Sequence, residues 1–279
     1  MVITGAMFWW ETARKKDRPP EKFKLLRSPG ETQRRRVQKT DENLFFYFFG
    51  GACVPLVILS LVWLLAMRLP KRLVPVGAAV AAFLFVASTV CATILLLRFL
   101  NRRRNDLLGY LGERAVAEQL EPLKGDGYRI FHDVPCEGRN KNFNIDHVVV
   151  GRTGVAAIEV KARRKKKGRA GFEEHVVTYD GQRLIWPWGE DRCGIDQVRA
   201  EADWLREFIH IRTGLRVNPK AILALPGWYV TENVVGAFRV ANHKLVPTIV
   251  REWNPQPITP DQIDLISRQL EERCRDVED

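Results

Sequence analysis

The chain has 279 residues, room for one or two domains with a hydrophobic core, and a formal net charge of +11 at pH 7. This charge does not by itself indicate nucleic-acid binding, because residues 1–100 hold 15 Lys and Arg against 6 Asp and Glu, whereas residues 101–279 hold 29 against 27. The 5 cysteines form no C-x-x-C pair, which excludes a disulfide framework or a zinc site of the usual spacing and is typical of a reducing cytoplasm.

Two long runs without a charged residue lie in the first third of the chain, from Leu44 to Met67 and from Leu73 to Leu97. Each can cross a hydrocarbon core about 30 Å thick, because a helix rises about 1.5 Å per residue. A cleaved signal peptide does not explain them, since the first run starts far from the N-terminus and ends without a small-residue cleavage site. We therefore expect two transmembrane helices in a lipid bilayer, at about 44–67 and 73–97.

The short link between these runs, Arg68 to Arg72, requires a hairpin with both ends on one side of the membrane. Lys and Arg are more numerous beside the outer ends of the hairpin than in the link, and this bias favours the cytoplasm for both ends. We expect a multi-pass protein of the cell's inner (plasma) membrane with cytoplasmic N- and C-termini. Residues 1–43 are rich in charge and proline, which predicts a basic, largely disordered cytoplasmic tail.

From residue 105 to residue 279 the pattern alternates between helices and strands, which predicts one soluble domain. Its expected elements are a helix from Asp106 to about Leu120, strands at Tyr128–Val134, Phe143–Val150 and Val155–Val160, a hairpin over 176–186, a helix from Asp196 to about Ile211, a strand at Ala221–Leu225, strand pieces near Phe238 and at Leu245–Val250, and a closing helix from Thr259. The fold class is therefore α/β or α+β, with a mixed central sheet flanked by helices.

One strand hairpin carries a pair of acids. If the turn at 151–154 is symmetric, Asp146 faces Glu159, and their Cβ atoms lie about 4.5–5.5 Å apart on the same face of the sheet. Two carboxylates among apolar neighbours repel each other and lose hydration, and Mg²⁺ (or Mn²⁺) compensates for both effects. Lys161 lies two residues further and shares this face. The alternative is a solvent-exposed strand end with three salt-bridged charges.

These residues resemble a known signature. Asp146, a 12-residue gap and then Glu159-Val-Lys161 are similar to the PD-(D/E)XK nuclease pattern. The surrounding elements resemble NERD, the nuclease-related domain, over about 107–225: Gly-Glu at 112–113 on the first helix, the Ile-Asp-His-Val-Val-Val strand at 145–150, and a later helix that carries Gln197. The resemblance implies a restriction-endonuclease-like fold.

The resemblance also implies roles for individual residues. Asp146 and Glu159 correspond to the metal ligands, Lys161 to the catalytic lysine, Glu113 to an acid of the first helix near the metal, and Gln197 to a helper residue. From the residues alone, Glu113 is equally well a solvated helix residue, and Gln197 an ordinary helix-start residue. The chain also has Gly-Ile-Asp at 194–196 where the family commonly has Asn-Pro.

A basic loop follows the second strand of the hairpin directly. It holds six cations within seven residues: Arg163, Arg164, Lys165, Lys166, Lys167 and Arg169. Beside a metal site, such a loop is suited to contacts with nucleic-acid phosphates. A solvated loop and a contact with the membrane surface are the alternatives.

Together these patterns predict a membrane-anchored, metal-dependent nuclease that hydrolyses phosphodiester bonds of nucleic acid, DNA in the first place, at the cytoplasmic face. The chain has no P-loop, dinucleotide fingerprint or serine nucleophile elbow. Two other functions stay open at this point. One is a non-catalytic membrane protein that binds DNA, and the other is a membrane adaptor or signalling scaffold whose globular domain meets another protein.

Overall fold

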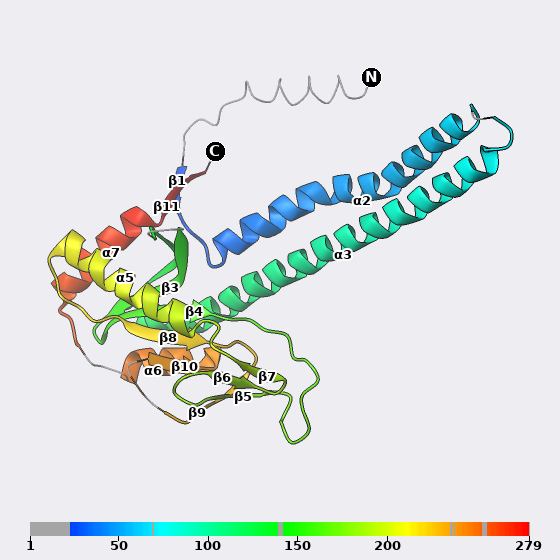
Figure 1. Ribbon diagram of the computed structural model, residues 1–279. Coiled ribbons are helices and arrows are strands. Elements are labelled where there is room, and N and C mark those ends of the chain that lie inside the picture. Colours follow the sequence, from blue (N-terminus) through cyan, green and yellow to red (C-terminus); the bar gives the residue numbers. More distant parts are fainter. Residues whose placement is uncertain are drawn as a thin grey trace.

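The computed structural model describes residues 23–68, 70–138, 142–234, 236, 238–252 and 256–278 (Figure 1). Its helices are α2 Glu31–Ala66, α3 Val74–Leu120, α4 Pro122–Gly125, α5 Ile195–Thr213, the short 3-10 helix η1 His243–Leu245, α6 Val246–Glu252 and α7 Pro260–Arg273. Its strands are β1 Phe23–Leu26, β2 Arg129–Cys136, β3 Phe143–Gly151, β4 Gly154–Val160, β5 Val176–Tyr179, β6 Leu184–Trp186, β7 Gly189–Asp191, β8 Lys220–Ala224, β9 Tyr229–Glu232, β10 Phe238–Ala241 and β11 Arg275–Glu278.

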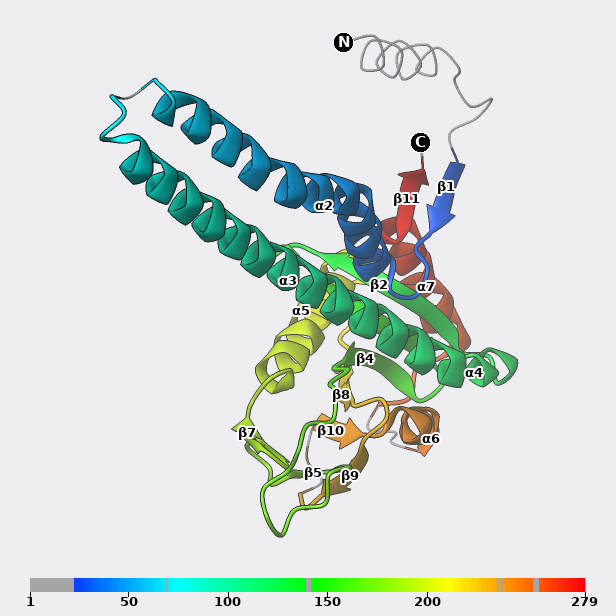
Figure 2. The same ribbon diagram turned by 90° about the vertical axis from the view of Figure 1, so that its right-hand side faces the viewer.

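Helices α2 and α3 form an antiparallel hairpin that projects from the rest of the molecule (Figures 1 and 2). Both are long and apolar enough to cross a membrane. Small residues bring the two helices close together. Gly77 and Ala81 are buried where most neighbouring side chains are exposed, and a Cβ atom added to Gly51 would lie 3.8 Å from the Cβ of Ala92.

The hairpin is longer than its apolar runs, and this corrects two expectations. Helix α2 begins at Glu31, inside the segment 1–43 that was expected to be a disordered tail, and residues 1–22 of that segment lie outside the described residues. Helix α3 continues without a break through residue 105, where the sequence predicted the start of a separate domain. No Pro or Gly interrupts the charged stretch 98–106, and an ion pair between Arg103 and Asp41 joins the two helices there.

The fold is mixed α+β, as predicted. Its central sheet has the strand order β10-β8-β4-β3-β2. Strand β8 is parallel to both of its neighbours, β10 and β4, whereas β3 is antiparallel to both of its neighbours, β4 and β2. Apolar side chains of α5 and α7 pack on one face of this sheet, and those of α3 and α6 pack on the other. The sheet is therefore the middle of three layers, and α3 links the apolar hairpin directly to the core.

A second mixed sheet, in the order β7-β6-β5-β9, lies beside the first. The predicted strand at 245–250 is wrong, because these residues form η1 and α6. The apolar residues of α6 are spaced for a helix rather than a strand: Val246, Ile249 and Val250 are all buried on one side. The predicted closing helix is confirmed as α7, whose Thr259 and Gln262 form a capping box.

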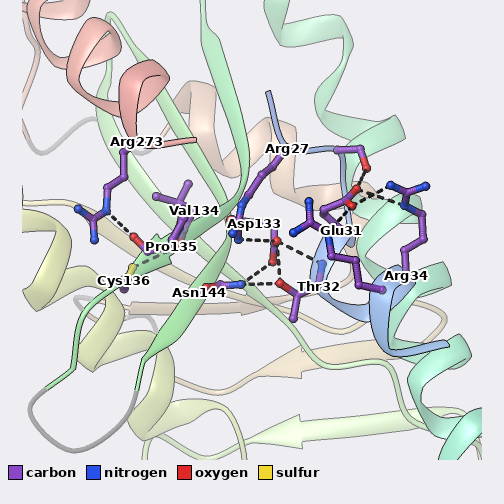
Figure 3. A network of polar contacts seen from close by, with 12 residues as sticks. Arg27, Glu31, Thr32, Arg34, Asp133, Val134, Pro135, Cys136, Asn144 and Arg273 are labelled. Carbon is purple, nitrogen blue, oxygen red and sulfur yellow. Dashed lines mark hydrogen bonds and ion pairs between the residues drawn. The ribbon is translucent and has the colours of Figure 1, made fainter. Parts of the chain in front are cut away.

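The base of the hairpin is fixed to the central sheet through Asp133 of β2 (Figure 3). This carboxylate is buried and accepts hydrogen bonds from the guanidinium of Arg27 at 2.9 Å, from the backbone N–H of Thr32 at 3.2 Å, from the Thr32 hydroxyl at 2.8 Å and from the Asn144 amide at 2.9 Å. Asp133 also has a φ of 49°, a conformation that Asp and Asn adopt more readily than most residues. Residues 27–32 are thus part of the folded domain.

Replacing Asp133 by Ala is expected to lower the free energy of unfolding by about 3 kcal/mol, because it leaves several buried donors without an acceptor. The measurement is urea unfolding of the detergent-solubilised chain, followed by tryptophan fluorescence. The matched control is Asp264→Ala, which removes an exposed ion pair with Arg129 and is expected to cost less than about 1 kcal/mol. Equal losses in the two variants would contradict the role given to Asp133.

Candidate active site

The turn between β3 and β4 is symmetric, and its predicted register is confirmed. His147 pairs with Ile158 and Val150 with Val155, and the same register continued by one residue sets Asp146 opposite Glu159. A carboxylate oxygen of Asp146 accepts a hydrogen bond from the backbone N–H of Val160, the residue after Glu159, at 2.7 Å. The two acids therefore meet on one face of the sheet, the face that α5 covers.

A third acid extends this pair across the sheet. The β2–β3 pairs on either side of Asp133 place it opposite Asp146, so that Asp133, Asp146 and Glu159 form one row across β2, β3 and β4. Asp133 was not among the residues that the sequence singled out. Its charge is balanced by the ion pair with Arg27 at 2.9 Å, and its place in this row is therefore structural.

A fourth acid comes from α3. Glu113 is 4% exposed and lines the same cleft as Asp146 and Glu159, so the solvated helix position considered from the sequence does not apply. Gly112, the residue before Glu113, allows α3 to lie close to the end of β4. A Cβ atom added to Gly112 would lie 2.6 Å from the Cβ of Ala162, so only glycine permits this approach.

A fifth acid, Glu201, lies on α5 and was missed by the sequence analysis. It is fully buried, and one of its carboxylate oxygens accepts a hydrogen bond from the amide of Gln197 at 2.8 Å. The oxygen of the same amide accepts a hydrogen bond from Lys161 Nζ at 2.9 Å, and Lys161 also forms an ion pair with Glu159. Gln197 thus connects the predicted lysine to an additional acid one helical turn away. The four-residue spacing on one helix was the available signal for Glu201.

Gly194 allows α5 to start beside the site. Its φ is 90°, and a Cβ atom there would lie 3.0 Å from Cγ of Lys161 and 2.8 Å from a methyl carbon of Leu223. The departure from Asn-Pro at this place therefore does not displace Gln197, which reaches Lys161.

These side chains surround a cleft of about 610 Å³. Its lining includes all five residues that the sequence predicted for the chemistry: Glu113, Asp146, Glu159, Lys161 and Gln197. Its charged lining residues are four acids and two cations: Glu113, Asp133, Asp146, Glu159, Arg36 and Lys161. The cleft thus holds more negative than positive groups, and any anionic ligand needs compensating charge there.

Burial and mutual repulsion raise the pKa values of Asp146, Glu113 and Glu201. Burial raises the pKa of Asp146 well above its usual value, and Glu159 and Glu113 raise it further. Burial and the charges of Asp133 and Glu159 raise the pKa of Glu113 to about 8. The pKa of Glu201 is raised well above its usual value by burial and by Glu159. For Lys161, burial alone would lower the pKa, but the ion pair with Glu159 outweighs burial and raises it.

Two buried carboxylate oxygens fit a cation. Oε2 of Glu159 and Oε2 of Glu201 have no hydrogen-bond partner, and buried acceptors of this kind are costly unless a proton or a cation satisfies them. Within the described ranges, no three Asp, Glu, His or Cys side chains form a ready-made ligand group. Mg²⁺ does not require one, since it binds through one or two carboxylates and keeps several waters.

The histidine next to Asp146 belongs to the core and not to the cleft. His147 is fully buried on the opposite face of β3, and its Nδ1 lies 2.9 Å from Nδ1 of His132. Burial lowers the pKa of His147 well below its usual value and lowers that of His132 to about 4. Both rings are therefore neutral at pH 7, and the sequence interpretation of His147 as a core residue is confirmed.

The basic loop lies outside the lining of the cleft and is held against an aromatic cluster. The guanidinium of Arg163 lies 4.7 Å from the centre of the Trp186 ring and pairs with Asp191 at 2.6 Å, and Arg164 donates to the backbone carbonyl of residue 104 in α3 at 2.8 Å. The next cations lie over rings as well: Lys165 over Trp228, Lys166 over Trp188 and Arg169 over Phe172. Lys167 is exposed. The loop thus holds its cations on a defined surface beside β4.

The comparison with protein families matches one model. Residues 108–226 match NERD, the nuclease-related domain, and this range agrees with the 107–225 inferred from the sequence motifs. No curated protein and no solved structure matches the chain. The segment that holds the hairpin acids, Lys161 and Gln197 thus matches the nuclease-related domain, whereas α2 lies outside the match.

Replacing Glu201 by Gln is expected to raise the free energy of unfolding in EDTA at pH 8 by about 1–2 kcal/mol, because an amide is neutral without taking up a proton, whereas the buried Glu201 must hold one. The gain depends on pH with a definite sign. Because the pKa of Glu201 is raised in the folded state, the wild type loses stability as the pH rises above the unfolded value of 4.5.

The advantage of Glu201→Gln is therefore expected to shrink toward pH 4.5. Urea unfolding across this pH range measures it, with Glu207→Gln as the control, since Glu207 is an exposed residue of the same helix. A difference between Glu201→Gln and the wild type that is constant with pH would contradict the assignment of a protonated Glu201.

Proposed function

We propose that this chain is a membrane-anchored, metal-dependent nuclease that hydrolyses phosphodiester bonds of nucleic acid, DNA in the first place, at the cytoplasmic face of the inner membrane. The observation that carries the proposal is the convergence of Asp146, Glu159 and Lys161 in one cleft of a nuclease-related domain. Glu113 and Gln197 line the same cleft, so the full predicted set lies together.

The proposed cofactor is Mg²⁺ or Mn²⁺, held by Asp146 and Glu159. In such a site the ion polarises a phosphate oxygen and lowers the pKa of bound water. The two carboxylate oxygens of Glu159 have different surroundings: Oε1 pairs with Lys161, and Oε2 has no hydrogen-bond partner. A cation and the lysine can therefore be bound by the same carboxylate at the same time.

Lys161 is the proposed residue that stabilises negative charge on the phosphate under attack. Its ammonium group is fixed by Glu159 and by Gln197, so little reorientation is needed when the substrate binds. Its raised pKa keeps it charged at neutral pH. Glu113, with a pKa of about 8, is able to hold or release a proton near neutral pH, which suits a group that accepts a proton from water.

The proposed location follows from the hairpin. Helices α2 and α3 are apolar enough to span the bilayer, and the Lys and Arg beside their outer ends favour the cytoplasm for the globular part. The loop cations Arg163, Arg164, Lys165, Lys166, Lys167 and Arg169 are proposed to contact nucleic-acid phosphates next to the cleft.

The test is cleavage of plasmid DNA by the full chain in lipid nanodiscs with Mg²⁺. Glu159→Gln and Lys161→Met are each expected to reduce the cleavage rate at least ~100-fold, because each removes a charge that acts at the reacting phosphate. EDTA is expected to abolish cleavage of the wild type. The control Glu118→Gln, an exposed residue of α3, is expected to cleave at the wild-type rate.

Cleavage that persists in both site variants would contradict the proposal. Tight DNA binding by the wild type without any cutting would instead support a non-catalytic DNA-binding protein. The absence of both activities, tested with RNA as well, would support an adaptor or scaffold.

A further inference from the structure

Helix α2 forms part of the wall of the cleft, although it lies outside the segment that matches the nuclease-related domain. Three of its side chains line the cleft, namely Thr32, Gln33 and Arg36. The match begins at residue 108. The membrane hairpin therefore contributes side chains to the candidate active site as well as anchoring it.

The position of α2 at the cleft is fixed by hydrogen bonds. Thr32 donates from its backbone N–H and its hydroxyl to Asp133, and its hydroxyl also accepts from the amide of Asn144 at 2.6 Å (Figure 3). Arg36 lies four residues further along the same helix and so on the same face as Thr32. The network that anchors Thr32 in the first turn of α2 thereby directs Arg36 to the cleft.

Arg36 differs from the cations around it. Arg34 and Arg35 bind the buried carboxylate of Glu31, and Lys161 is paired with Glu159. Arg36 is exposed, and within the part of the chain that the structure describes its side chain has neither an ion pair nor a hydrogen bond. It is thus the one cation of the cleft lining that is available to a ligand among the described residues.

The charge of the cleft identifies the ligand. The lining holds four acids and only two cations, and one of these cations, Lys161, is already paired with Glu159. A guanidinium presents several N–H donors in a fixed plane that matches the oxygens of a phosphate group. We propose that Arg36 binds a backbone phosphate of the nucleic acid next to the phosphate that is cut, so that the membrane hairpin is part of the substrate-binding site. This inference rests on the proposed nuclease function.

The same geometry places the substrate close to the lipid. Arg36 precedes Leu44, the first residue of the long uncharged run, by about two turns of helix, which corresponds to about 12 Å along the axis. A nucleic-acid strand bound by Arg36 therefore runs near the membrane surface.

The test uses the full chain in nanodiscs, a short fluorescein-labelled DNA duplex and EDTA, so that binding is measured without cutting. Arg36→Gln is expected to weaken binding about tenfold and to reduce the slope of log affinity against log salt by about one. Arg36→Lys keeps the charge but loses the planar set of donors, and its affinity is expected to lie between those of the wild type and Arg36→Gln. The control Arg102→Gln removes the same charge from an exposed residue of α3 outside the cleft and is expected to bind within about twofold of the wild type.

A thermal unfolding measurement on each variant separates a loss of binding from a loss of folding. Because Arg36 is exposed, its replacement is expected to leave the unfolding temperature unchanged. An Arg36→Gln protein that binds like the wild type, while the wild type cleaves DNA with Mg²⁺, would overturn this inference and leave the nuclease proposal standing. Equal weakening by Arg102→Gln would overturn it too, since the effect would then be general electrostatics. A wild type that neither binds nor cuts nucleic acid would overturn both.

Discussion

The main physical constraint on this protein is the free-energy cost of gathering several carboxylates in and beside one partly buried cleft. Asp146 and Glu159 face each other across the β3–β4 pair, and Glu113 and Glu201 approach from two different helices. Burial and mutual repulsion make their ionised forms unfavourable, so that in the protein without metal some of them keep their protons. A fold selected for stability alone would replace such a cluster with apolar residues. Its presence is best explained by a ligand that supplies positive charge.

The elements around the cleft each allow this convergence. The tight turn between β3 and β4 sets the register of the pair, Gly112 lets α3 lie against the end of β4, and Gly194 lets α5 begin beside Lys161. Helix α3 combines two tasks, because its first part belongs to the apolar hairpin and its last part carries Glu113. With 47 residues it is about 70 Å long. A continuous helix of this kind fixes the distance between the apolar hairpin and the site.

Local sequence patterns predicted those parts of the site that lie close together in the chain. The short turn at 151–154 predicted the register that brings Asp146 opposite Glu159, because a symmetric turn determines which residues of the two strands face each other. Asp133 and Arg36 reach the cleft through long-range packing, which no local period encodes, whereas the signal for Glu201 was its four-residue spacing from Gln197. The same limit explains why the sequence predicted that the folded domain begins only at residue 105. Charge and proline content indicated a tail, whereas contacts of residues 27–32 with a strand a hundred residues later make that segment part of the fold.

The central claim is that a divalent cation binds between the acids of β3 and β4. The most direct test is anomalous X-ray scattering at the manganese edge from crystals of the full chain grown with Mn²⁺, beside crystals of Asp146→Asn. The account predicts a peak within coordination distance of the carboxylates of Asp146 and Glu159 in the wild type and its loss in the variant. A wild-type crystal whose Mn²⁺ lies elsewhere, or in which these two carboxylates point to opposite faces of the sheet, would contradict it.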